Sequence, residues 1–523
     1  MRPCPTTPTR GTRRFTPAAT RIATRTATRT ATRTATRAAV RSVGVAVASA
    51  TVLLLPALGA TPTELKAQAI DVAQVQYQED RAVMARFRPG HTFWEHVFAV
   101  PDGWVAFGSA SDGRLLAAFP TRGDWGREAR WEEPALRATL AGRPLERAIS
   151  PRRDQVADLL AQATGAPVVH NATRGTFVQP NARRYGGFLA EWGAIYERFG
   201  VPAEIGLAQA MIESGWNPTV RSEARAMGFC QWLESNWNHM KRLAPHEIEG
   251  HNQTTQAAYC AAYLRILATK YGSYIPALSE HHAGGTNVGR TVINGARLGG
   301  ESIREQYFLG SQLAVDLRGL DSPRFRDVYI SYGPRSFLYA EMVFGNEAQV
   351  ARIRDGMRQD RIHAMRTTRS VPIEEVMRRS GLSRDEVQRY NPALVRQVPA
   401  RATLYLPMHI DDLGRDVAFW HRGPNPEFAV VLRDFLLLDA PPENWHQPAF
   451  RQILEGYRQR FLATQSEEGA IMATVLAYNM GELFTSRRAE ILAEYRADPR
   501  VQALVDEGLR EIMLQNIQST WVR

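Results

Sequence analysis

One apolar helix places the strongest constraint on how this chain can fold. Pro202 occupies a first helical position, and Gly215 followed by Pro218 supplies the stop. Between them, apolar side chains recur at helical spacing: Ile205, Ala208, Met211 and Ile212. A helix this apolar has to be covered by other elements, so we expect a mainly α domain around it.

Glu213 lies in the last turn of this predicted helix, between Ile212 and Ser214. Partial burial disfavours the charged form of a carboxyl group, so we expect its pKa to be raised towards the range of a general acid. Taken alone, a solvent-facing Glu at a helix end explains the same pattern better. The spacing of the residues that follow changes this balance.

A spaced set of polar residues continues from Glu213. It reads Glu213-Ser214, Asn217-Pro218, Ser222 and Gly228-Phe229-Cys230-Gln231. This set resembles the pattern of the lysozyme-like domain of soluble lytic transglycosylases, which has Glu-Ser, Asn-Pro, Ser and Gly-x-x-Gln at the same intervals. The resemblance continues more weakly through 257–267 to Tyr307 and covers about residues 180–315.

The resemblance implies a peptidoglycan lytic transglycosylase, a carbon–oxygen lyase without a cofactor or metal. In that family the Glu protonates the oxygen of the MurNAc–GlcNAc β-1,4 bond, and the N-acetyl group of the substrate stabilises the cation-like centre. The same Glu then removes the proton of the C6 hydroxyl, which gives a 1,6-anhydro product. Glu213 is accordingly expected to act as acid and then base, with Ser222, Gln231 and Tyr307 lining the sugar groove.

The chain departs from the family at one motif. Where the family has Ala-Tyr-Asn-Ala-Gly, this chain has Glu280-His281-His282-Ala283-Gly284, so two histidines replace the Tyr and Asn. We expect both histidines to contact substrate, and an imidazole could replace the hydrogen bond of the Tyr while adding pH sensitivity. Other readings are a muramidase-type hydrolase with Glu280 as second carboxylate, zinc on the two histidines, or a non-catalytic peptidoglycan-binding scaffold.

A copy of the missing motif occurs downstream at Leu476-Ala477-Tyr478-Asn479-Met480-Gly481. It could complete the groove if the chain returned to it, or it could belong to an ordinary packed helix. Position in the sequence does not decide between the two.

A second resemblance lies between residues 367 and 410. Gly381-Leu382, Glu386-Val387, Tyr390-Asn391-Pro392 and Leu404-Tyr405-Leu406-Pro407 are similar to the second half of a LysM module, which binds N-acetylglucosamine chains. The Gly-Asp-Thr-Leu opening of that module is replaced by Ser370-Val371-Pro372-Ile373. The combination resembles the architecture of the lytic murein transglycosylase D family.

At 523 residues the chain is too long for one core, so we predict a multidomain protein. The expected regions are a leader at 1–69, a β-rich region at 70–165, a lysozyme-like α+β domain at 166–330, a helical extension or linker at 331–366, a LysM-like βααβ module at 367–410, and a helical region at 411–523. In the β-rich region, Asp-Gly turns separate the predicted strands: 96–100, 104–108 and 114–119.

The charge of the chain is concentrated in its leader. Residues 1–69 hold ten Arg, one Lys and one Glu, so about +1 of the net +11 remains for the rest. This excludes nucleic acid as the default partner. The Arg-rich start and the apolar run from Val43 to Leu58 indicate an export signal, with an uncleaved membrane anchor as the alternative.

Export to the periplasm or cell envelope fits glycan strands of peptidoglycan as the partner and allows association with the cell wall or the membrane surface. The sequence does not indicate an oligomeric state. Beyond the leader only Cys230 and Cys260 remain, and they could form a disulfide or stay as two buried thiols.

Overall fold

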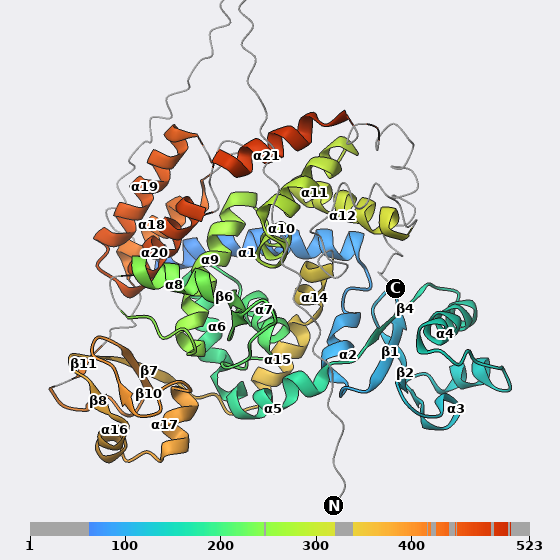
Figure 1. Ribbon diagram of the computed structural model, residues 1–523, viewed down its shortest axis with the longest axis horizontal. Helices are drawn as coiled ribbons and strands as arrows, with labels where there is room; N and C mark the ends of the chain where they lie inside the picture. Colours follow the sequence, from blue (N-terminus) through green and yellow to red (C-terminus); the bar gives the residue numbers. More distant parts are fainter. Residues whose placement is uncertain are drawn as a thin grey trace, which may run out of the picture. The chain divides into compact units, whose positions relative to one another are not determined.

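Helices dominate the computed structural model, and small sheets lie beside them (Figure 1). The structure describes residues 62–244, 247–319, 338–415, 417–419, 425–438, 445, 447–482, 486–499 and 503. The prediction of a mainly α chain is confirmed for these residues. The apolar run of the leader lies outside them, and none of the described helices combines the length and apolar character needed to cross a membrane.

The first described element is helix α1 (Pro62–Phe87), so the expected β-rich region begins with a long helix. Tyr77 and Met84 on α1 are buried in the same apolar core as the helix that holds Glu213. Helix α1 packs against four other helices: α10 (Tyr274–Ala283), α12 (Ile303–Gly319), α14 (Tyr339–Gly345) and α18 (Pro426–Leu436). It therefore joins segments that are distant in sequence.

A four-stranded antiparallel sheet follows, with strand order β3-β2-β1-β4. The predicted hairpin is confirmed, and Gly113 in its turn has a φ of +74°. The strands are β1 (Trp104–Ser109), β2 (Leu115–Pro120), β3 (Arg130–Trp131) and β4 (Val168–Ala172). Short helical elements and one long helix accompany the sheet: α3 (Trp125–Glu128), η1 (Pro134–Leu140) and α4 (Ile149–Thr164).

The strand predicted at 96–100 is wrong, because this segment belongs to helix α2 (Phe93–Ala99). Its buried side chains recur at helical rather than alternating spacing: Phe93, Trp94, Val97 and Phe98. Burial against the central core thus decided the local structure of this short apolar run.

The central region consists of helices around one small hairpin, in the α+β arrangement that was predicted. Helix α7 (Ala203–Ser214) is buried along most of its length, as its periodicity indicated. The other elements are α5 (Gly175–Tyr185), η2 (Gly186–Phe188), α6 (Leu189–Arg198), β5 (Ala226–Met227), β6 (Trp232–Leu233), α8 (Glu234–Leu243), α9 (Gln253–Tyr271), α11 (Gly285–Arg297) and α15 (Glu347–Asp355).

A small module with its own apolar core spans residues 362–419. The predicted helices are present as α16 (Ile373–Ser380) and α17 (Arg384–Tyr390), and they lie in sequence between β7 (Ile362–Thr367) and β10 (Thr403–Pro407). Three short strands complete it: β8 (Val371–Pro372), β9 (Gln397–Val398) and β11 (Val417–Phe419). The described part of the segment expected to be a helical extension or linker, 338–366, contains the helices α14 and α15 and the start of β7.

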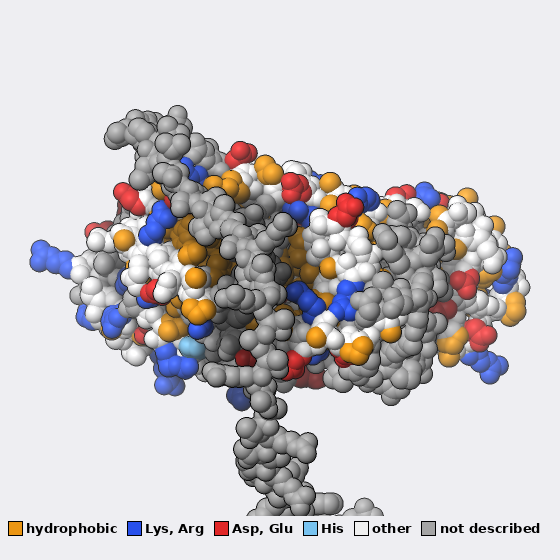
Figure 2. Space-filling view, turned by 90° about the horizontal axis from the view of Figure 1, so that it is seen from above, with side chains coloured by type: hydrophobic (Ala, Val, Ile, Leu, Met, Phe, Trp, Pro, Cys, Tyr) orange, Lys and Arg blue, Asp and Glu red, His pale blue; other side chains and the backbone are white. Residues whose placement is uncertain are grey.

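The described part of the C-terminal region contains four helices, in agreement with the helical region predicted at 411–523. They are α18, α19 (Pro448–Ala463), α20 (Glu467–Glu482) and α21 (Ser486–Ala497). Helix α20 packs on α8 and α9, and α21 packs on α11 (Figure 1). On the face seen in Figure 2, acidic and basic side chains are interspersed over the described surface.

Candidate active site around Glu213

The end of helix α7 is held in place by its own sequence. Gly215 adopts a left-handed conformation with φ +58°, which is the usual way to end a helix. The hydroxyl of Ser214 donates to the carbonyl oxygens of Ala210 and Phe229, both at 3.0 Å. The last turn of the helix is therefore tied to the loop that contains Phe229, and Glu213 lies within this turn.

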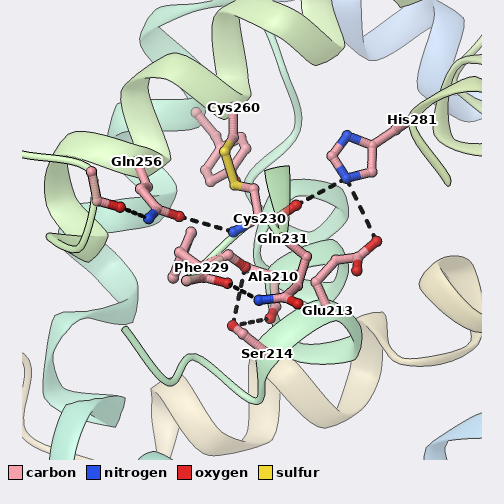
Figure 3. Close-up of a disulfide and its surroundings, with 12 residues drawn as sticks. Ala210, Glu213, Ser214, Phe229, Cys230, Gln231, Gln256, Cys260 and His281 are labelled. Atoms are coloured by element: carbon pink, nitrogen blue, oxygen red, sulfur yellow. Dashed lines mark hydrogen bonds and ion pairs between the residues drawn. A yellow bond between two sulfur atoms is a disulfide. The ribbon is translucent and has the colours of Figure 1, made fainter. Parts of the chain in front are cut away.

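The loop opposite Glu213 is anchored to helix α9. The backbone N–H of Cys230 donates to Oε1 of Gln256 at 3.1 Å, and the Cys230 and Cys260 side chains form a disulfide with Cα atoms 6.5 Å apart (Figure 3). Of the two states considered for these cysteines, the structure contains the disulfide. Two links to one helix thus fix the backbone of Cys230.

The Glu213 carboxyl group is mostly enclosed, with 13 % of its side chain exposed. Tyr339 Oη donates to Glu213 Oε1 at 2.5 Å, and His281 Nε2 lies 3.5 Å from the same oxygen (Figure 3 shows the His281 contact). Glu213 lies on α7, and its two partners come from α14 and α10. A carboxyl group with this little exposure and two polar partners has the surroundings of an acid/base catalyst.

The expected upward shift of the Glu213 pKa is not observed. Burial raises the pKa of this carboxyl group. Three neighbours together lower it by more than burial raises it: His281 through its hydrogen bond and charge, His282 through its charge, and Tyr339 through its hydrogen bond. The net shift of the pKa is therefore downward. The lowering depends mainly on protonated imidazoles. The ionisation of Glu213 is therefore linked to the charge of its histidine neighbours.

His282, the second predicted histidine contact, stacks on the other partner of Glu213. Its ring lies 4.6 Å from the ring of Tyr339 with an angle of 6° between the planes, and the residue is exposed. Neighbouring groups displace part of the water around the ring and so lower the pKa of His282, although the charge of Glu213 opposes this. An exposed flat ring next to the carboxyl group is suited to contact a sugar.

Glu280 is enclosed elsewhere and does not provide a second catalytic carboxylate in this geometry. Its side chain has no exposed surface, Lys270 Nζ lies 2.7 Å from Oε2, Tyr271 also donates to Oε2, and Arg488 from α21 lies 3.0 Å from Oε1. Burial raises its pKa, but the charges of Lys270 and Arg488 outweigh this and lower the pKa to about 2. Glu280 is thus a buried structural anion.

Ser222 and Gln231 shape the loop between α7 and α8. The Ser222 hydroxyl accepts from the Ala226 N–H at 3.0 Å, and Ser222 is exposed. Gln231 Nε2 donates to the carbonyls of Val220 and Gly228 at 3.2 and 2.9 Å. Both residues therefore support the hairpin beside Glu213, and their contact with sugar stays a prediction.

Tyr307 is buried, with only 1 % of the residue exposed. Its hydroxyl is within 2.5 Å of the Ser279 hydroxyl. A groove role for Tyr307 would require its neighbours to move, whereas Tyr339 already contacts Glu213. Sequence reasoning missed Tyr339, because it lies after a stretch without a recognisable motif and no local pattern distinguishes it from a packing residue.

The downstream copy of the motif lies in helix α20. The Tyr478 ring packs edge-on against His239 of α8 at 5.5 Å, and Asn479 is fully buried with its amide bonded to the Val475 carbonyl. These contacts are those of helix packing.

Within the described residues there is no group of three His, Cys, Asp or Glu that could hold a metal ion.

Comparison with known families places this site in a recognised domain. Residues 191–301 match the family model described as Transglycosylase SLT domain. The match includes Glu213, the loop through Gln231 and both histidines, and it ends before Tyr339. It indicates lytic transglycosylase activity on peptidoglycan for this domain. None of the curated proteins compared with the chain matches it.

Proposed function

We propose that this chain cleaves the MurNAc–GlcNAc β-1,4 bond of peptidoglycan and releases a 1,6-anhydro product, with Glu213 as acid and base. The observation that carries the proposal is a single enclosed carboxyl group, held by Tyr339 and His281 within the matched domain. The proton of Glu213 passes to the bridging oxygen as the C1–O bond breaks, and the substrate N-acetyl oxygen stabilises C1. The carboxylate then takes the C6 hydroxyl proton while O6 bonds to C1, which restores the protonated Glu213.

The lytic outcome is favoured over hydrolysis by the position of Glu280. A retaining or inverting hydrolase uses a second carboxyl group beside the bond. Glu280 is enclosed by Lys270, Tyr271 and Arg488 and has no exposed surface. It is therefore unable to activate water in this arrangement.

Mass analysis of digested peptidoglycan tests the proposal. Purified sacculi treated with the chain should give muropeptides that lack one water relative to reducing-end products, and Glu213→Gln should give none. Reducing-end products from wild type would instead identify a muramidase-type hydrolase.

A non-catalytic peptidoglycan-binding scaffold is the second candidate, and the lowered pKa of Glu213 favours it. A carboxyl group whose pKa is lowered by its histidine neighbours gives up more readily the proton that bond cleavage needs. Equal binding of wild type and Glu213→Gln to sacculi, with no clearing by either, would support the scaffold and refute the enzyme.

The proposal extends to the regions outside the matched domain. The order β7, α16, α17, β10 supports a LysM-like module, and with the catalytic domain it supports the lytic murein transglycosylase D architecture. Export to the periplasm or cell envelope is supported by the leader and by the Cys230–Cys260 disulfide, because disulfides persist in oxidising compartments. Protease protection of the chain in intact cells, lost when the outer compartment is opened, would test this location.

A further inference from the structure

His281 makes two polar contacts through one nitrogen. Nε2 lies 3.1 Å from the carbonyl oxygen of Cys230 and 3.5 Å from Oε1 of Glu213 (Figure 3). A carbonyl oxygen can only accept a hydrogen bond, so Nε2 must carry a hydrogen. The imidazole consequently faces Glu213 as a donor in both its neutral and its charged form.

The position of this donor is fixed from outside helix α10. The Cys230 carbonyl belongs to the loop that the disulfide and Gln256 anchor to α9. The Tyr263 ring of α9 packs edge-on against the imidazole, with ring centroids 5.9 Å apart. The ring is thus oriented by groups on two elements besides its own.

Both polar contacts of the Glu213 carboxyl group in the described part of the chain involve Oε1. Tyr339 Oη donates to it at 2.5 Å, and His281 Nε2 lies 3.5 Å from it. A proton on Oε1 would compete with these two donors, whereas a proton on Oε2 would not. The hydrogen-bond pattern therefore distinguishes the two carboxyl oxygens.

We propose that His281 is a positioning residue that, with Tyr339, occupies Oε1 of Glu213 and directs the catalytic proton to Oε2. This inference rests on the proposed function of Glu213 as acid and base. Oε2 would deliver the proton to the bridging oxygen and later accept the C6 hydroxyl proton. The histidine thus takes the donor place left by the absent Tyr of the motif.

The charge of His281 is also one of the causes that lower the pKa of Glu213. The groups that face the imidazole are Glu213 from α7, Tyr263 from α9, Tyr339 from α14 and the adjacent His282. Burial raises the pKa of both tyrosines well above the ordinary value, so they stay neutral near pH 7. A protonated His281 lowers the pKa of Glu213, so an uncharged donor in its place should let Glu213 keep its proton to higher pH.

Substitution of His281 by Gln or by Leu tests the inference. Gln keeps an amide donor but no charge, and Leu keeps neither. We expect His281→Gln to clear peptidoglycan near the wild-type rate. As the pH rises, the variant should lose its activity at a higher pH than wild type does. We expect His281→Leu to be about tenfold slower in kcat with little change in KM, because one charge-assisted donor is lost. His239→Gln is the matched control, since His239 lies on α8 and packs against Tyr478 of α20.

A readout without turnover keeps this test separate from that of the proposed function. Nitrogen NMR should show hydrogen on Nε2 of His281, and the Glu213 carboxyl carbon should titrate at higher pH in His281→Gln than in wild type. An Nε2 without hydrogen, or an unchanged carboxyl titration, would overturn the inference even in an active enzyme. If wild type fails to cleave peptidoglycan while these shifts are present, the proposed function fails and the His281–Glu213 link stands. Thermal unfolding of each variant distinguishes a lost donor from a lost fold.

Discussion

Tyr339 Oη lies 2.5 Å from Oε1 of Glu213, although 126 residues separate the two in sequence. The hydroxyl is delivered by α14, a helix beyond the matched domain. The site is therefore assembled from the matched domain and one helix outside it.

Tyr339→Phe should lower the rate of peptidoglycan clearing about tenfold, because it removes a hydrogen bond to the catalytic carboxyl group. Turbidity assays on purified sacculi measure this. Tyr259→Phe is the control, since the Tyr259 hydroxyl is buried without a partner among the described residues. Equal rates for Tyr339→Phe and wild type would exclude a catalytic role for this contact.

Removal of the disulfide by Cys260→Ser should lower the free energy of unfolding by roughly 2–4 kcal/mol. The bond closes a loop with a sequence separation of 30 and joins the Cys230 loop to α9. Urea unfolding of wild type and variant, with and without reductant, measures the difference. Reductant should lower the free energy of unfolding of wild type but not of the variant. An equal effect of reductant on both proteins would show that the two cysteines are thiols.

Replacement of Glu280 by Gln should lower the free energy of unfolding by about 3–5 kcal/mol at neutral pH, because Lys270 loses its buried partner. The pKa of Glu280 is lowered from 4.5 to about 2, so the folded state binds its proton less tightly than the unfolded state. This stabilisation is present above about pH 4.5 and is lost as pH falls towards 2. Urea unfolding from pH 7 to 3 should show the difference between the two proteins shrinking.

Glu305→Gln provides the comparison for Glu280, since its partner Arg86 is 54 % exposed and such pairs contribute at most about 1 kcal/mol. A Glu280→Gln protein that is as stable as wild type but inactive would restore the hydrolase reading.

Gly215→Ala should destabilise the fold and misplace Glu213. The left-handed conformation costs a non-glycine residue about 1–2 kcal/mol, and an added Cβ would lie 2.5 Å from the carbonyl oxygen of Phe177. Gly165→Ala at the end of α4 is the matched control, because its φ is +69° but nothing lies within 4 Å of an added Cβ. In thermal unfolding, Gly165→Ala should have a higher Tm than Gly215→Ala. The reverse order of Tm values would contradict the role of the Phe177 contact.

The sequence by itself determined the elements whose signals are local. The periodicity from Ile205 to Ile212 with the Gly215 stop predicted α7 and the place of Glu213 on it, and the Asp112-Gly113 turn predicted the β1–β2 hairpin. The helices α16 and α17 were predicted as part of the LysM-like βααβ module. These patterns depend on residues three or four apart, or on one turn. The rest of the chain therefore has little influence on whether such elements form.

Only the tertiary structure decided which side chains meet Glu213. It brought Tyr339 to the carboxyl group, turned His281 towards the Cys230 carbonyl, and buried Glu280 against Lys270. It also placed 96–99 in helix α2, where a strand had been predicted from the Asp-Gly turn that follows. Such outcomes depend on how helices pack, because packing sets the burial and the charged neighbours that determine which carboxyl group can exchange a proton.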